Sequence, residues 1–138
     1  MNKKDKKEMI YQKDGKVELL FKATYKGYNF YILNLGTHPT AYVNIPAGHP
    51  YYFKHYDDID IDVHGGLTYS ENFLYIDKNT KIEGFFIGWD YAHWGDYFGY
   101  FINDEILGKG NDKAKKWTTD EIIQECLDAI EQLESKGE

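Results

Sequence analysis

The chain has 138 residues and a formal net charge of −7, and its 16 basic residues are all lysine. This length predicts one folded domain. The acidic charge and the lack of arginine argue against duplex nucleic acid as a partner. The absence of an apolar run of about 18 residues argues against a membrane partner. Because the lysine-rich start lacks the apolar stretch of a secretory signal, we expect a cytoplasmic protein.

The first part of the chain predicts a lysine-rich arm followed by short strands. Residues 1–13 show little periodicity, so we expect a flexible arm in front of a single domain at 14–138. Alternating apolar residues of high β propensity then predict three strands, at 16–25, 28–35 and 40–45. Lys26-Gly27 is a turn signal between the first two strands, which predicts an antiparallel pair.

The most regular stretch of the sequence runs from Asp57 to His64. With the side-chain period of a strand, its apolar and polar residues separate onto two faces. The apolar face holds Ile59, Ile61 and Val63. The polar face holds Asp58, Asp60, Asp62 and His64. We therefore predict a strand that turns an acidic face away from the core.

The second half of the chain predicts more strands and a terminal helix. Strand-like runs lie at 67–69, 81–89 and 97–102, and a polar loop covers 103–117. Thr118 and Glu121 match a capping box, which marks the start of a helix. Apolar residues then recur at helical spacing, at Ile122, Ile123, Cys126, Leu127, Ile130 and Leu133. The predicted fold class is α+β, a mainly antiparallel sheet packed against an amphipathic C-terminal helix.

The first candidate site is His64-Gly65-Gly66, directly after the acid-faced strand. A double glycine tolerates positive φ and lets main-chain N–H groups approach an anion. These three residues are therefore candidate ligand contacts. The structural alternative is a tight turn whose histidine is hydrogen-bonded nearby, and the sequence alone favours that alternative.

The second candidate site is the segment from Trp89 to Asp96, which follows the strongest predicted strand. Asp90, His93 and Asp96 are spaced by three, so one turn or compact loop can gather them. Asp90 can also orient His93 as a general base. In the structural alternative, the two aspartates cap local N–H groups while Trp89 and Trp94 pack beneath them.

Catalytic and metal-binding roles stay open from the sequence. In one alternative, a divalent cation is held by four side chains, His64, Asp90, His93 and Asp96. If these four side chains do not bind a cation, we expect no cofactor. No catalytic residue is assigned, because Ser70 and Cys126 lack the sequence context of a nucleophile. His38 and His55 fit no pattern. Whether His64 and His93 share one pocket decides whether there is a site at all.

Four segments of the chain occur in a characteristic order. They are Pro46–Pro50, Tyr56–Tyr69, Ile87–Asp96 and Trp117–Glu121. Together they resemble a family of small phage and prophage proteins from low-GC bacteria, over about residues 40–133. The resemblance carries no assigned reaction, but it implies a phage accessory protein that acts in the cytosol of a bacterial host.

Three functions follow from these observations. The leading hypothesis is a protein that binds and sequesters a small nucleotide-type ligand and so counters host nucleotide immune signalling. Trp89, Trp94 or nearby tyrosines would stack on a base, while His64, His93 and the N–H groups of Gly65 and Gly66 would hold phosphate. The alternatives are a metal-dependent hydrolase acting on a nucleotide or phosphoester, and a protein-interaction inhibitor of a host enzyme. The 13 tyrosines also suit an oligomer interface, which makes a homo-oligomer a further expectation.

Overall fold

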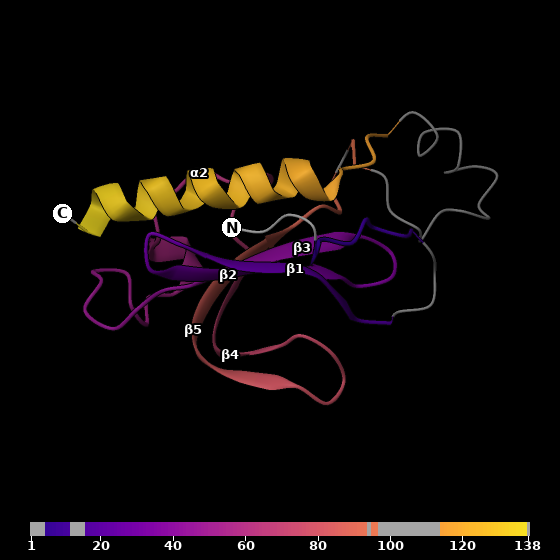
Figure 1. Ribbon diagram of the computed structural model, residues 1–138. Helices are drawn as coiled ribbons and strands as arrows, with labels where there is room; N and C mark the ends of the chain where they lie inside the picture. Colours follow the sequence, from indigo (N-terminus) through magenta and orange to yellow (C-terminus); the bar gives the residue numbers. More distant parts are fainter. Residues whose placement is uncertain (1–4, 12–15, 94, 97–113, 138) are drawn as a thin grey trace.

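The computed structural model describes residues 5–11, 16–93, 95–96 and 114–137. Within these residues one five-stranded sheet has the strand order β1-β2-β3-β5-β4, and all neighbouring pairs are antiparallel (Figure 1). The elements are β1 (Glu18–Tyr25), β2 (Tyr28–Asn34), β3 (Pro39–Asn44), the 3-10 helix η2 (Tyr56–Asp58), β4 (Tyr69–Tyr75), β5 (Lys81–Asp90) and α2 (Thr119–Gly137). The predicted α+β class with an antiparallel sheet is confirmed.

The predicted turn between β1 and β2 is confirmed and has a simple backbone explanation. Lys26 and Gly27 both have positive φ, 51° and 86°. Two consecutive residues of this kind make a type I′ turn, whose twist matches that of the flanking strands. Glycine reaches this region without strain, whereas Lys26 does so at a cost of about 1 kcal/mol.

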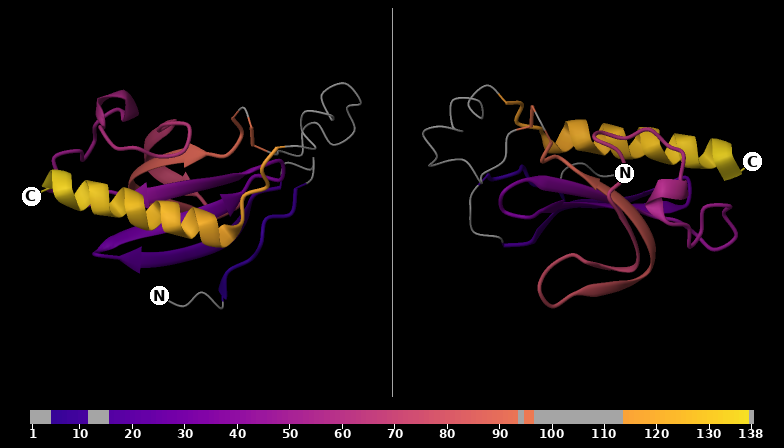
Figure 2. Two further views of the ribbon diagram at one scale, coloured as in Figure 1. Left: turned by 90° about the horizontal axis from the view of Figure 1, so that it is seen from above. Right: turned by 180° about the vertical axis from the view of Figure 1, so that it is seen from behind.

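Helix α2 lies across β1, β2 and β3 on one face of the sheet (Figures 1 and 2). Its buried apolar residues form the main core with the strands, and they include Ile122, Ile123, Cys126, Ile130 and Leu133. The predicted capping box is confirmed. The Glu121 main-chain N–H donates to the Thr118 hydroxyl at 3.2 Å, and the Thr118 N–H donates to the Glu121 carboxylate at 3.0 Å.

The far face of the sheet carries a second, smaller apolar cluster. The hairpin of β4 and β5 bends away from α2 (Figure 1). It brings Ile76 and Ile82 against a cluster built on Leu33, Leu74 and Phe86. The apolar run of β5 lies inside the sheet, between β3 and β4. Of the short strand predicted at 67–69, only Tyr69 lies in a strand, as the first residue of β4.

The strand predicted at 57–64 is wrong. The segment beyond η2 is extended, but among the described residues it joins no sheet, because side chains of α2 take its hydrogen bonds. The Asp62 N–H donates to Gln132 Oε1 at 2.6 Å, and Gln132 Nε2 donates to the Asp62 carbonyl at 2.8 Å. The His64 N–H donates to Glu125 Oε1 at 2.7 Å. The predicted alternation of buried isoleucines and exposed aspartates persists, because one side of the segment still faces the core.

The expected flexible arm is partly held against the fold. The Lys7 N–H donates to the Leu20 carbonyl at 2.7 Å, and the Thr119 hydroxyl donates to the Lys7 carbonyl at 2.5 Å. Lys6 also pairs with Asp120 at 2.6 Å. Residues 5–11 therefore connect the edge of β1 to the start of α2.

Several predicted features fall on other parts of the chain. The strand predicted at 97–102 and most of the loop predicted at 103–117 lie outside the described residues, as do residues 1–4 and 12–13 of the expected arm. Within the described residues, no helix combines the length and apolar composition needed to cross a bilayer.

Candidate functional site

The two loops that carry His64 and His93 meet at one end of the sheet. β3 begins and β5 ends there, with Thr40 opposite Asp90, and α2 starts close by (Figures 1 and 2). The two imidazole rings have centroids 5.6 Å apart and an interplanar angle of 71°. Their side chains are 23% and 33% exposed. The two candidate segments therefore form one partly exposed cluster.

A buried carboxylate, Asp96, fixes the orientation of His64. Asp96 is 4% exposed and accepts from three N–H donors. These are the His64 ring Nε2 at 2.7 Å, the His93 main-chain N at 3.0 Å and the Trp117 indole at 2.8 Å. The three hydrogen bonds compensate the buried charge. Because a neutral imidazole donates from one nitrogen only, the contact places that proton on Nε2 and leaves Nδ1 as the acceptor.

A layer of aromatic rings supports His64 on the helix side. The Tyr91 ring stacks on the His64 ring at 5.0 Å with an angle of 6°. The Tyr91 hydroxyl donates to Glu125 Oε1 at 3.1 Å and accepts from the Trp89 indole at 2.9 Å. Burial raises the pKa of Tyr91 strongly, and the charge of Glu125 raises it further. The hydroxyl therefore stays protonated, as its hydrogen bond to Glu125 requires.

The second imidazole, His93, is paired less completely. Alternation along β5 directs Asp90 to the far face of the sheet, away from Tyr91 and the helix. His93 Nε2 lies 3.1 Å from Asp90 Oδ1, but the two are not aligned as a hydrogen bond. Asp90 accepts instead from the Ala92 N–H at 3.1 Å and, more weakly, from the Thr68 hydroxyl at 3.4 Å. Asp90 is thus held in place while the His93 nitrogen has no aligned acceptor.

Unsatisfied polar atoms gather beside Asp90. Among buried side-chain nitrogen and oxygen atoms of the described residues, those without a hydrogen-bond partner are Thr40 Oγ1 and His93 Nε2. Thr40 pairs with Asp90 across the strands, so both residues lie at the same end of the sheet. Buried polar groups are almost always hydrogen-bonded, and two exceptions at one place mark a strained or functional position.

Gly65 and Gly66 confirm the expectation of positive φ, at 70° and 83°. A Cβ on Gly65 would lie 2.2 Å from His93 Nε2, so the glycine is what allows this close approach. A Cβ on Gly66 would meet nothing within 4 Å. The Gly66 N–H donates to the Val63 carbonyl at 3.0 Å and is therefore used within the turn.

Three residues of the cluster had no predicted role. Glu125 and Trp117 hold the main chain of His64 and the carboxylate of Asp96, respectively. Burial lowers the pKa of His38, and the charges of Asp90, His93 and Asp96 also act on it, which places His38 within electrostatic range of the cluster. The position of His38 in the sequence could have indicated this, because His38 stands just before β3 and the first residues of β3 pair with the end of β5.

The tryptophans expected to stack on a ligand are placed differently. Trp89 is 1% exposed and belongs to the core, so it offers no free ring face. Trp94 lies outside the described residues. Trp117 borders the site instead. Its ring centroid is 4.8 Å from that of His64, and the Lys115 ammonium lies 4.0 Å from the centroid of the Trp117 ring.

The residues of the alternative metal set are close together but are not arranged as metal ligands. No group of three or more His, Cys, Asp and Glu side chains in the described part of the chain is placed to hold a metal ion. Asp96 is directed at three N–H donors, and one of these is the Nε2 atom of His64. The four-ligand set that the sequence suggested is therefore not assembled.

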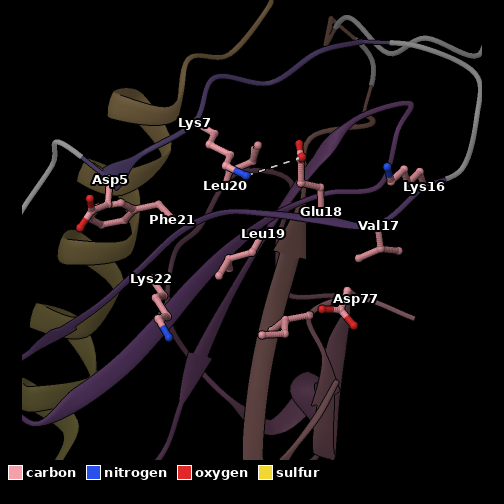
Figure 3. Close-up of a pocket in the computed structure, with 11 residues that line it drawn as sticks. Asp5, Lys7, Lys16, Val17, Glu18, Leu19, Leu20, Phe21, Lys22 and Asp77 are labelled. Atoms are coloured by element: carbon pink, nitrogen blue, oxygen red, sulfur yellow. Dashed lines mark ion pairs between the residues drawn. The ribbon is translucent and has the colours of Figure 1, made fainter. Parts of the chain in front are cut away.

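A separate groove of about 460 Å³ runs along the outer edge of β1 (Figure 3). Its charged lining residues are Asp5, Lys7, Lys16, Glu18, Lys22 and Asp77. Lys7 and Glu18 form an ion pair there at 3.8 Å. The groove shares no residue with the cluster of His64 and His93, and its mixture of signs indicates no particular ligand.

Comparison with known proteins does not name this cluster. No protein-family model, curated protein or solved structure matches the chain. The family resemblance expected from the sequence stays a prediction. A function has to be inferred from the two imidazole–carboxylate pairs themselves, His64 with Asp96 and His93 with Asp90.

Proposed function

We propose that the protein binds a small nucleotide-type ligand at the cluster of His64, His93, Asp90 and Asp96 and withdraws it from host immune signalling. The observation that carries the proposal is the convergence of two imidazoles from distant segments at one partly exposed place. Protonated imidazoles donate hydrogen bonds to phosphate oxygens. The Trp117 ring beside them is an aromatic surface for a base.

The charges around the cluster limit the kind of ligand. Each imidazole has a carboxylate beside it, and the neighbouring Lys115 is paired with Glu121 at 2.7 Å. The chain has no arginine. A triphosphate needs several cations to hold it, whereas one or two imidazoles can meet a single negative charge. We therefore expect a ligand with one phosphodiester group, such as a cyclic nucleotide.

The two alternative functions have less support in the described residues. A metal-dependent hydrolase requires a ligand set that is not assembled there. Inhibition of a host enzyme by direct contact has no specific observation in its favour. Pull-down from host lysate remains the experiment for that second alternative.

Calorimetric titration with a panel of cyclic and ADP-ribose-derived nucleotides tests the proposal. We expect a monoanionic cyclic nucleotide to bind wild-type protein in the micromolar range and to lose at least about tenfold in affinity in His93→Ala, because a hydrogen bond to a charged group is removed. His55→Ala is the matched control, since the His55 side chain is 56% exposed and contacts Tyr56 and Asp57 locally. If no nucleotide binds more tightly than millimolar, the proposal fails.

A further inference from the structure

The His64–His93 cluster combines two features that binding alone does not require. Each imidazole has a carboxylate at its Nε2 atom, at 2.7 Å for His64 and 3.1 Å for His93. Neither Nδ1 atom has a hydrogen-bond partner among the described residues, and neither is among the buried unpaired atoms. Two imidazole rings thus lie close together, each with a carboxylate beside its Nε2 atom.

The two pairs differ in a way that suits them to opposite proton-transfer roles. In the neutral form of His64, the aligned bond from Nε2 to Asp96 uses the one proton of the ring, so the Nδ1 atom carries a lone pair that accepts a proton. His93 lies against Asp90 without an aligned bond. A carboxylate in that position is a counter-ion for the protonated ring. Histidine occurs in both protonation states near neutral pH, so one ring can act as base while the other acts as acid.

The spacing fits a single phosphate group between the rings. With centroids 5.6 Å apart, the two rings are close enough for one phosphodiester group to contact both of them. Metal-assisted chemistry is not supported by the described residues, and the chain has no arginine to neutralise a polyanion. A substrate with one negative charge and an alkoxide leaving group is the class that such an acid–base pair serves best.

We infer that His64 and His93 catalyse metal-independent hydrolysis of a nucleotide phosphodiester, with His64 as general base and His93 as general acid. The inference rests on the proposed function, because a nucleotide must first bind at the same cluster. In this scheme the protein withdraws the ligand by hydrolysing it rather than by binding it reversibly. The catalytic residues in this scheme are the two that face the reacting phosphate, while Asp96 and Asp90 position them.

The reaction balances without any further reactant than water. His64 Nδ1 takes a proton from water as the water oxygen forms a bond to phosphorus. The bond between phosphorus and the ribose oxygen breaks, and that oxygen receives the proton from His93. A cyclic nucleotide and one water thus become one nucleoside monophosphate. The extra proton on His64 is lost to solvent and His93 is reprotonated from solvent, which restores the starting state.

The experiment incubates full-length protein with 2′,3′-cyclic AMP or 3′,5′-cyclic AMP in the presence of EDTA and follows the product by phosphorus NMR and chromatography. We expect wild-type protein to form adenosine monophosphate. His64→Gln and His93→Gln should each lower the rate at least about 100-fold, the usual contribution of a general acid or base. His55→Ala should stay within about twofold of wild type. Circular dichroism and thermal unfolding establish that each variant is folded.

The outcomes separate this inference from the proposed function on which it rests. Calorimetric binding of a nucleotide with no product from wild-type protein overturns the hydrolysis and leaves the binding function standing. No binding and no product overturns both. Turnover that disappears with EDTA, or a folded His93→Gln variant that works at the wild-type rate, also overturns the inference. The wild-type measurement is decisive even where a variant does not fold.

Discussion

The two imidazole–carboxylate pairs lie side by side but differ in how completely they are hydrogen-bonded. On the helix side, Asp96 is buried and accepts three N–H donors, and His64 is stacked on Tyr91. On the far side, Asp90 is 26% exposed, and His93 Nε2 has no aligned partner. The carboxylate of the first pair is buried, whereas that of the second is partly exposed.

The difference in hydrogen bonding between the two pairs shows how a small fold can present a reactive group. A polar network in a low-dielectric core is stable only when every member is satisfied. The His64–Asp96 pair meets that condition and acts as a rigid support. The His93–Asp90 pair does not, because the buried His93 Nε2 atom has no aligned acceptor.

The largest effect is expected from Asp96→Asn. An amide group cannot accept all three N–H donors, so at least one buried donor loses its partner and the free energy of unfolding should fall by about 3 kcal/mol. Asp90→Asn, the matched change in the other pair, should cost less than about 1 kcal/mol because Asp90 is partly solvated. Urea unfolding measures both. Equal losses in the free energy of unfolding would show that the two pairs contribute equally to stability.

The next effect in size is expected from Gly65→Ala. The added methyl group would be strained by the positive φ and would displace the His93 ring, at a total cost of about 2 kcal/mol. Gly66→Ala has a similar φ but open space around it, so it should cost about 1 kcal/mol. Chemical unfolding gives the stabilities, and nucleotide titration should show weakened binding for Gly65→Ala alone. Equal stability and equal nucleotide affinity of the two variants would show that His93 does not take part in binding.

Tyr91→Phe tests the aromatic support on the helix side. The change keeps the ring that stacks on His64 but removes the hydroxyl that accepts from the buried Trp89 indole. We expect a loss of about 1–2 kcal/mol in the free energy of unfolding, the cost of leaving a buried donor unpaired. Denaturation followed by tryptophan fluorescence measures it. An unchanged stability would mean that the hydroxyl is not part of the support.

The smallest effect concerns pH and His38. Because burial lowers its folded pKa below the ordinary value of 6.5, the unfolded chain binds the proton more readily. The contribution of His38 to stability is therefore present above pH 6.5 and is lost as the pH falls through the lowered folded pKa. His38→Gln should lose less stability than wild type between about pH 7.5 and 5. Parallel pH profiles for the two proteins would contradict this assignment.

Much of the fold could be predicted because it depends on local patterns. The turn at Lys26-Gly27 and the cap at Thr118 are formed by residues that are adjacent or three positions apart in the sequence. The strands β1, β2, β3 and β5 follow from alternation and β propensity, which act within a few residues. The predicted strand at 57–64 failed for the opposite reason. Its alternation was real, but side chains from α2 satisfied its backbone in place of a neighbouring strand.

The site was predictable in its members and not in its arrangement. His64, Asp90, His93 and Asp96 stood out because such residue types beside glycines are suited to ligand chemistry. The sequence paired His93 with Asp90 but offered no partner for His64. Glu125 and Trp117, which hold the first pair in place, looked like ordinary residues of a helix and its approach. Trp89 was expected at the ligand and lies in the core, because alternation along β5 turns it toward the helix.

Local sequence patterns account for the antiparallel α+β fold, the capped C-terminal helix and the double-glycine turn after His64. The convergence of His64 and His93, and the carboxylate that each one meets, come from long-range packing. The reason is that convergence depends on hydrogen bonds from α2 to the extended segment before His64. Such contacts join residues far apart in the chain, and no local period or propensity encodes them.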